Sequence, residues 1–354
     1  SSLTDAQGHV RRDVIQKLCV EVASVRAGDR QVVIVSSGAI GAGLPAIGFP
    51  DQRPRDPRTL QAASAVGQSR LMALYDEALA RHDLVAGQVL LAPFDFFERS
   101  QYLQARGTLE RLLELGVVPV INENDAVADD AIRFGDNDRI AALVAHLVGA
   151  DRLVLLTDTP GLFTSDPRHD PSASLIREIT SIEDDLPAVI GGAGTERGSG
   201  GMASKVSAAR MAAFSGVTTV IAAADRQDVL REAIEEAPEV GTIVRPQPRS
   251  LPAKKLWIGF AVVPAGSLTV DAGAQRALSQ SGGSLLAVGV RAVAGEFSRG
   301  EPVEIAGPDG VAFARGMASV SSDELAALVG KRSHDHPDGT PDEVIHRDDL
   351  VLLR

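Results

Sequence analysis

The sequence contains one cysteine and no long apolar run, and each shortage excludes a class of protein. With Cys19 alone among 354 residues, neither an intrachain disulfide nor a cysteine-based metal site can form. Cys19 falls in an apolar, helix-like run, which favours a buried, inert thiol over a catalytic nucleophile. No apolar run approaches the ~18 residues that cross a bilayer, and residues 1–10 lack the features of a signal peptide. We therefore expect a cytoplasmic protein without a membrane partner.

Positive charge is also scarce. The 35 lysine and arginine residues are outnumbered by 47 aspartate and glutamate residues, which gives a net charge of −12. Proteins that bind nucleic acid usually present a basic face, because neutralising phosphates supplies most of their affinity. The acidity therefore weighs against a nucleic-acid partner. The hydrophobic fraction of 44% is that of an ordinary folded protein, and the length predicts two domains.

Helix-like and strand-like segments alternate up to about residue 245. Apolar residues at helical spacing predict helices at 10–25, 60–79, 103–115, 140–148, 205–214 and 229–237. Short apolar or β-branched runs predict strands at 32–35, 85–91, 117–121, 153–156 and 217–222. This alternation implies crossover connections, and hence an α/β fold in which helices cover both faces of a parallel sheet.

The pattern changes near Arg245, where RPQPRSLPAKK combines three prolines with little periodicity. Beyond it, short β-like segments are expected at 267–270, 285–293, 302–305, 311–315 and 349–353, with one helix at 323–329. We therefore expect a first domain at 1–245, a linker at 246–261 and a small, mostly β domain at 262–354. The last carries 8 basic and 13 acidic residues, a net charge of −5, which is a poor footprint for RNA.

In open α/β sheets, ligands bind beyond the carboxyl ends of the strands. The first predicted strand ends in Ser36-Ser37-Gly38, and Gly41 and Gly43 follow. Small residues let a backbone approach a ligand closely, and N–H groups at a helix start can bind an anion. A plain strand-to-helix turn explains the same residues equally well.

A second polar cluster follows the strand at 117–121. It consists of Asn122-Glu123-Asn124-Asp125, and Asp136-Asn137-Asp138 comes 11 residues after Asp125 at a helix start. Acidic and amide side chains on both sides of one loop suit an ammonium group and a metal-bound phosphate. The alternatives are a helix cap and turn formers, but capping accounts for one residue of GDND and not for three.

Two further stretches could meet a nucleotide. Thr157-Asp158 end the strand at 153–156 before a Pro-Gly turn, and an ordinary turn is the simpler explanation of those two residues. In GSGGMASK, residues 198–205, glycines precede a helix that carries Ser204 and Lys205, an arrangement suited to polyphosphate. Its spacing differs from that of a Walker A loop, and on composition alone a flexible loop with a solvated lysine is the favoured explanation.

Taken in this order, these stretches resemble the glutamate 5-kinases of the amino acid kinase family. The matching stretches are VSSGAIGAG, GQVLL, VVPVINENDAV, FGDND, LLTDTPGLFTSDPR and GSGGMASK, then WIGF, GSLTVDAGA, SLLAVGV, FSRGE and HRDDL. The resemblance implies a parallel-sheet amino acid kinase fold with a C-terminal PUA domain. It also implies ATP-dependent phosphorylation of the γ-carboxylate of L-glutamate to L-glutamyl 5-phosphate and ADP, in proline biosynthesis. Aspartate, acetylglutamate and uridylate kinases share the fold but not this set of motifs.

The resemblance assigns roles to individual residues. Contacts with glutamate are expected from Ser37, Gly38, Ala39, Asp125, Asp136 and Asn137. Contacts with the nucleotide are expected from Thr157, Asp158, Ser199, Gly200, Gly201, Met202, Ala203, Ser204 and Lys205. Lys205 would stand at the transferring phosphoryl group and Asp138 would orient it. Mg²⁺ would bridge the ATP phosphates without a dedicated protein site, and His334-Asp335-His336 fits a solvated loop better than a metal site.

The resemblance also implies partners and one departure from the family pattern. Its members form homo-oligomers, dimers or tetramers, and are inhibited by proline at the glutamate site. The family normally opens with a strand carrying K-x-G, whose lysine touches the phosphates, whereas Ser1–Thr4 resemble the stretch after that motif. We expect that these 354 residues lack one strand of the central sheet and have severely impaired activity.

Two rival hypotheses stay open at this point. One is a different kinase on this fold that also forms an acyl phosphate. The other is an RNA-binding protein with a vestigial kinase fold, which the acidic C-terminal domain does not favour.

Overall fold

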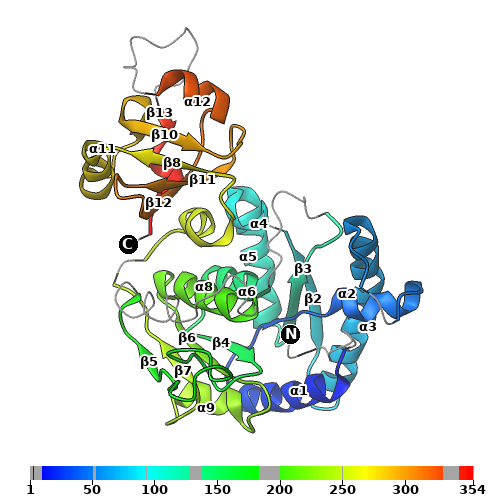
Figure 1. The fold of residues 1–354 in the computed structure, drawn as a ribbon. Coiled ribbons are helices and arrows are strands. Elements are labelled where there is room, and N and C mark those ends of the chain that lie inside the picture. Colours follow the sequence, from blue (N-terminus) through cyan, green and yellow to red (C-terminus); the bar gives the residue numbers. More distant parts are fainter. Residues whose placement is uncertain are drawn as a thin grey trace. The chain divides into compact units, whose positions relative to one another are not determined.

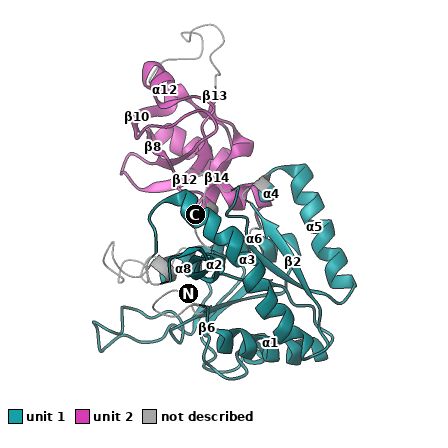
Figure 2. Cartoon of the chain, turned by 90° about the vertical axis from the view of Figure 1, so that its right-hand side faces the viewer, with its two compact units in different colours: residues 1–250 teal, residues 251–354 magenta. Residues whose placement is uncertain are grey.

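The computed structural model describes residues 3, 10–50, 53–92, 94–127, 137–182, 200–248, 250–329 and 343–353. The chain divides into two compact units, Ser1–Ser250 and Leu251–Arg354 (Figure 2). In these described ranges no helix is both long enough and apolar enough to cross a membrane. Residues 251–261 of the expected linker belong to the second unit, where they form α10 (Ala253–Leu256) and a π-helical turn, Trp257–Ala261.

The first unit alternates helices and strands, as the sequence predicts. Its helices are α1 (Arg12–Ala27), α2 (Ala39–Gly43), α3 (Pro57–Ala80), α4 (Phe94–Phe97), α5 (Arg99–Glu114), α6 (Asn137–Leu147), α8 (Gly200–Phe214) and α9 (Val229–Glu235). Its strands are β1 (Ile34–Val35), β2 (Ala86–Leu91), β3 (Val118–Glu123), β4 (Arg152–Thr157), β5 (Glu178–Ile179), β6 (Thr218–Ala223) and β7 (Thr242–Val244). The pattern did not predict α2, α4, β5 or β7, because each spans no more than five residues and shows too little periodicity.

The strands form two sheets with the orders β1-β3-β2 and β4-β6-β7-β5. All the pairings in the first sheet are parallel, and so is the pairing of β4 with β6. β7 runs antiparallel to β6, which departs from the fully parallel sheet that was expected. After β6 the chain passes through α9 and returns beside β6 in the opposite direction. The second sheet is therefore mixed.

Helices cover both sides of the strands (Figure 1). On one side, α1 and α3 bury Ile15, Cys19, Leu71 and Tyr75 in one cluster with β1 and β3. On the other side, α6 is almost entirely buried and contacts strands of both sheets, β1, β3 and β4. Burial raises the pKa of the Cys19 thiol to about 12, which keeps it protonated and inert as the sequence predicts.

Lys17 on α1 ties the two sheets together on the α1 side. Its ammonium group donates to Glu21 of the same helix at 2.8 Å, and to the backbone oxygens of Ala224 at 2.8 Å and Arg226 at 2.6 Å. These two carbonyls belong to the loop after β6. Glu21 in turn accepts from the backbone N–H of Leu230 at 2.9 Å. All three donors of the lysine are thereby used, and α1 fastens a loop of the second sheet to the first.

Helices α2 and α3 pack backbone against backbone. A Cβ atom on Gly43 would lie 1.8 Å from the carbonyl oxygen of Ala63, and one on Gly67 would lie 1.8 Å from that of Ala39. Side chains on both helices would normally keep the axes 8–10 Å apart. The two glycines remove them, so the segment after β1 is held directly on the middle of α3.

The second unit is a small, mostly β domain. A five-stranded sheet has the order β10-β8-β11-β12-β14, and β13 pairs with β9. The strands are β8 (Gly266–Val270), β9 (Leu285–Leu286), β10 (Val290–Ala294), β11 (Pro302–Ala306), β12 (Ala312–Met317), β13 (Glu343–Ile345) and β14 (Leu350–Leu352). The expectation of one helix, realised as α12 (Ser322–Leu328), was incomplete. Asp271 caps a further short helix, α11 (Ala272–Arg276), by accepting from the backbone N–H of Ala274 at 2.8 Å.

We predict that Gly67→Ala destabilises the first unit. The added methyl group would meet the backbone of Ala39 at 1.8 Å, and overpacking of this kind costs about 1–3 kcal/mol. The urea unfolding midpoint measures the loss.

Gly107→Ala on α5 is the matched control, because nothing lies within 4 Å of the added Cβ. Alanine in an exposed helix interior should stabilise by about 0.5–1 kcal/mol relative to glycine. A midpoint for Gly67→Ala as high as that of the control would contradict the close packing of α2 on α3.

Candidate active site

Most of the residues singled out in the sequence line one cavity of about 3100 Å³ in the first unit. The residues concerned are Ser37, Gly38, Ala39, Asp125, Asn137, Asp138, Thr157, Asp158, Met202, Ala203 and Lys205. Gly200 and Gly201 begin α8, and Ser204 on the same helix is not among the described residues that line the cavity. Asp136, Ser199 and His334-Asp335-His336 lie outside the described residues. The strand ends thus bring together side chains that are up to 168 residues apart in sequence, from Ser37 to Lys205.

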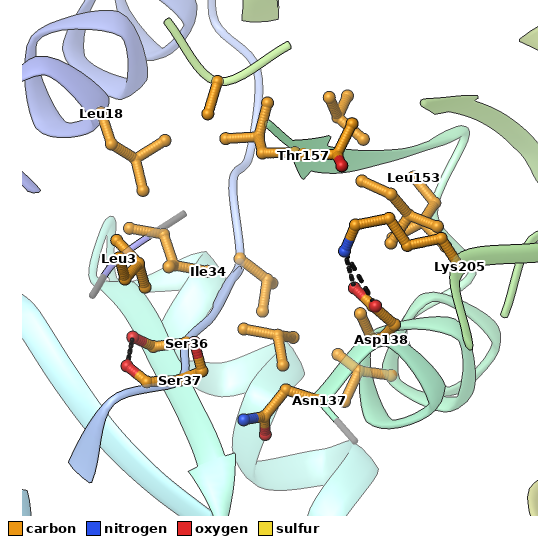
Figure 3. A pocket seen from close by; sticks show the side chains of 18 of the residues that line it. Leu3, Leu18, Ile34, Ser36, Ser37, Asn137, Asp138, Leu153, Thr157 and Lys205 are labelled. Carbon is orange, nitrogen blue, oxygen red and sulfur yellow. Dashed lines mark hydrogen bonds and ion pairs between the residues drawn. The ribbon is translucent and has the colours of Figure 1, made fainter. Parts of the chain in front are cut away.

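The segment after β1 enters the cavity on a glycine turn. Gly38 has φ of 101°, in the left-handed region that favours glycine, and it precedes the first residue of α2. Ser36, which is 1% exposed, lies 2.9 Å from the hydroxyl of the fully buried Tyr75 on α3. Ser36 also donates to the backbone oxygen of Ser37 at 3.2 Å (Figure 3). The first serine therefore supports the segment, and the second faces the cavity.

The end of β3 supplies an amide and carboxylates. Asn122 and Glu123 are buried in the strand, and Asp125 follows in a turn; all three line the cavity. Helix α6 begins at Asn137, whose side-chain oxygen is buried without a hydrogen-bond partner among the described residues. A buried acceptor left unpaired is costly, so Asn137 is suited to a ligand that brings a donor.

Sequence reasoning missed the residues of α3 that hold this strand end. Ser64 donates to Asp125 at 2.5 Å, and Gln68 accepts from the side-chain amide of Asn122 at 2.9 Å. Both are buried, at 4% and 7% exposure. Polar residues four apart on a helix share one face. In AASAVGQ, residues 62–68, two polar residues four apart among small apolar ones were the sequence feature that could have revealed this contact.

An ion pair joins α6 and α8 inside the cavity. The ammonium group of Lys205 donates to both carboxylate oxygens of Asp138, at 2.8 Å each (Figure 3). The two side chains are only 14% and 19% exposed, so water screens them weakly. A lysine has three N–H donors, and this pair uses two of them. The arrangement holds one positive charge at a fixed point of the cavity wall.

The ends of β4 and β6 form the opposite part of the wall. Thr157 is buried at the end of β4, and its hydroxyl donates to the carboxylate of Asp158 at 3.1 Å. The backbone N–H of Ala224, just after β6, donates to the carbonyl of Thr157 at 2.7 Å. Thr242 on β7 anchors the next loop by accepting from the backbone N–H of Leu162 at 2.8 Å. These hydrogen bonds hold Thr157 and Asp158 in place at the cavity wall.

Among the described residues no group of three or more His, Cys, Asp or Glu side chains is arranged to hold a metal ion. Among the carboxylates that line the cavity, those near the strand ends are Glu123, Asp125, Asp138 and Asp158, and Asp166 and Asp170 lie in the loop after β4. One or two carboxylates suit a Mg²⁺ ion that arrives with phosphate ligands and keeps several waters.

Part of the cavity lies between the facing edges of the two sheets, and we call this part the gap. β1 is an edge strand of the first sheet and β4 of the second, and residues 32–36 and 153–156 line the cavity from the two sides. Leu18 of α1 lies over the gap near Ile34 and faces the same space (Figure 3). Edges of this kind present N–H and C=O groups that can accept a further strand.

Comparison with known proteins identifies the fold and the relatives. The sequence profile of the amino acid kinase family matches residues 1–223, and that of the PUA domain matches residues 266–338. A protein of Geobacter sp. (strain M21) named glutamate 5-kinase is 45% identical over 99% of this chain and 95% of its own length. A glutamate 5-kinase of Herpetosiphon aurantiacus is 44% identical over the whole of this chain and 96% of its own.

Similarity to solved structures is weaker. Carbamate kinase from Giardia lamblia bound to AMP-PNP is 17% identical, with a TM-score of 0.48, over 67% of this chain and 91% of that one. The assignment therefore rests on the family profiles and the full-length relatives. The chain belongs to the amino acid kinase family, with a PUA domain after its kinase domain.

Proposed function

We propose that this protein transfers the γ-phosphoryl group of ATP to the γ-carboxylate of L-glutamate. The products are L-glutamyl 5-phosphate and ADP, and the reaction is the first step of proline biosynthesis. The observation that carries the proposal is the Lys205–Asp138 pair in a cavity that Asp125 and Asn137 also line. Relatives that are 43–45% identical over nearly the full chain and bear the name glutamate 5-kinase support it.

The substrate half of the site comes from the ends of β1 and β3 and the start of α6. The carboxylate of Asp125 and the unpaired side-chain oxygen of Asn137 suit the α-ammonium group of glutamate, and the side-chain N–H groups of Asn137 suit its α-carboxylate. Ser37, with the backbone of Gly38 and Ala39, contacts the substrate from the end of β1, the parallel neighbour of β3. Asp136 joins this set by family resemblance alone.

The nucleotide half comes from β4, β6 and the start of α8. Thr157 and Asp158 lie against the nucleotide, and the start of α8, with Met202 and Ala203 in the cavity wall, lies along its phosphates with Lys205 at the transferring group. Ser199 joins this set by family resemblance alone. Mg²⁺ would arrive with the ATP phosphates, and Asp158 is a carboxylate of the cavity that would suit it. The ion supplies positive charge to the phosphate oxygens.

The transfer itself needs no general base. An oxygen of the ionised γ-carboxylate attacks the γ-phosphorus in line. The bond to the β–γ bridging oxygen breaks, and ADP leaves with the electron pair. The protein's share is to align two anions and to neutralise charge on the transferring phosphoryl group. Lys205 provides the charge, and Asp138 keeps its ammonium group in place with two hydrogen bonds.

We also propose that a further parallel strand lies between β1 and β4 in the active enzyme. The two edges face one cavity, and apolar side chains such as Ile34, Leu153 and Leu155 line it. A strand pairs at ~4.8 Å from each neighbour, so one strand would join the two sheets into one. By family resemblance this strand carries K-x-G and brings a second lysine to the phosphates.

Several further expectations stay predictions: inhibition by proline at the glutamate site, a homo-oligomer, a cytoplasmic location and the absence of an RNA partner. The division at 245 and 261 likewise stays a prediction beside the compact units described above.

The first prediction concerns substrate choice. We expect ADP release that depends on L-glutamate, with little release for aspartate or N-acetylglutamate. The measurement is coupled detection of ADP over this panel, and a preference for either alternative substrate would remove glutamate as the acceptor.

The second prediction concerns Lys205. Lys205→Met should lower kcat by about 100- to 1000-fold, because the transferring phosphoryl group loses a preorganised positive charge. Lys254→Met is the control, since this half-exposed lysine pairs with Asp349 inside the second unit and is not among the described residues that line the cavity. Equal activity of the two variants would contradict the role of Lys205.

The third prediction concerns the gap between the sheets. An N-terminal extension able to form one strand with K-x-G should raise the activity of the 354-residue chain by about two orders of magnitude. An extension with prolines at alternate positions is the control, because proline cannot donate to the ladder. Full activity of a sample whose intact mass matches the 354 residues alone would refute the added strand.

A further inference from the structure

One serine of α3 occupies an unusual position for its residue type. Ser64 stands in the helix interior between Ala63 and Ala65 and is 4% exposed. Serine is a weaker helix former than alanine, and in mid-helix its hydroxyl commonly bonds to a carbonyl of the preceding turn. Here the hydroxyl leaves the helix and donates to Asp125 at 2.5 Å, 61 residues further along the chain.

The partner of this hydroxyl stands at the end of β3. Asp125 lies in the turn after the strand, beside the cavity. Within the described part of the chain, Ser64 supplies the hydrogen bond that this carboxylate accepts through its Oδ2 atom. One helical turn further on, Gln68 accepts from Asn122 at 2.9 Å, so α3 holds the same strand end at two points.

The same stretch of α3 also holds the other side of the substrate half. Ala63 and Gly67 touch the backbone of α2, which begins at Ala39 beside the cavity. Residues 63–68 therefore contact both parts of the substrate half. They pack against the backbone of α2 and form hydrogen bonds with the end of β3. Rotation of the Asp125 carboxylate is opposed by a donor on the buried face of α3.

We propose that Ser64 is a positioning residue that orients the Asp125 carboxylate toward the amino group of the substrate. Its hydroxyl occupies Oδ2, which leaves Oδ1 for an ammonium group in the cavity. The inference rests on the proposed function, because it takes glutamate as the molecule that Asp125 meets. Ser64 acts through Asp125 and touches no reacting atom.

A purely structural role makes the opposite prediction. If Ser64 only fills space in α3, Ser64→Ala improves helix propensity and leaves the kinetics of both substrates alone. If it positions Asp125, the same change frees the carboxylate and weakens glutamate binding. ATP binding is unaffected, because the nucleotide half is built from other elements.

The experiment is steady-state kinetics of Ser64→Ala, in whichever form of the chain shows glutamate-dependent ADP release. We expect the KM for glutamate to rise about tenfold, in line with loss of a hydrogen bond to a charged group. The kcat and the KM for ATP should stay within about twofold. Ser64→Thr, which keeps the hydroxyl, should restore most of the loss.

Ser69→Ala is the matched control on the same helix. Ser69 is exposed, and its hydroxyl donates to the backbone oxygen of Val66 at 3.3 Å in its own helix. This variant should keep both KM values. An unchanged KM for glutamate in Ser64→Ala, or an equal rise in the KM for ATP, overturns the positioning role.

A double-mutant cycle tests whether Ser64 acts through Asp125. In an Asp125→Ala background, Ser64→Ala should change the KM for glutamate by less than about twofold, because its partner is gone. A full tenfold effect in that background would overturn the proposal.

The four proteins of this cycle are the unmodified chain, Ser64→Ala, Asp125→Ala and the double variant. They also distinguish a failure of this inference from a failure of the proposed function. If glutamate supports no ADP release in any form of the chain, the proposed function fails, and urea unfolding of the cycle still decides the contact. A coupling of threefold or more in the folding equilibrium constant supports the Ser64–Asp125 bond, and no coupling refutes it.

Discussion

The ion pair between Lys205 and Asp138 is the interaction on which the candidate site depends. It joins α8, which leads into the second sheet, to α6, which follows the polar end of β3. The ion pair thereby links the half of the site that faces the amino acid to the half that faces the nucleotide. Because both side chains are largely shielded from water, their Coulomb attraction is screened less than that of a surface ion pair, and the two hydrogen bonds fix its direction.

The pair is effective because rigid elements hold its surroundings. Helix α6 is buried along nearly its whole length and contacts both sheets. On the opposite side, α3 is packed on α2 through Gly43 and Gly67, and it grips the end of β3 through Ser64 and Gln68. Phosphoryl transfer between two anions depends on alignment more than on acid–base chemistry. A site built from helix interiors and strand ends supplies that alignment.

The gap between β1 and β4 lies beside this site. Lys17 and α6 bridge the two sheets on opposite sides of it. Its apolar lining and its two strand edges suit the pairing of a further strand better than the binding of a small molecule. Although the overall charge is −12, the cavity wall carries the ammonium group of Lys205 at a fixed position, held there by Asp138.

The sequence by itself determined the alternation of helices and strands, the polar residues after β1, β3 and β4, and the family. Hydrophobic periods and the residues that end a strand are local properties, so they can be read along the chain. The antiparallel β7, the backbone contact of α2 with α3, and the bonds from Ser64 and Gln68 were decided only by the tertiary structure. Each depends on residues that lie far apart in sequence, such as Ser64 and Asp125. The local sequence shows only that such a side chain is polar or small. Which partner it contacts is determined by the packing of the folded chain.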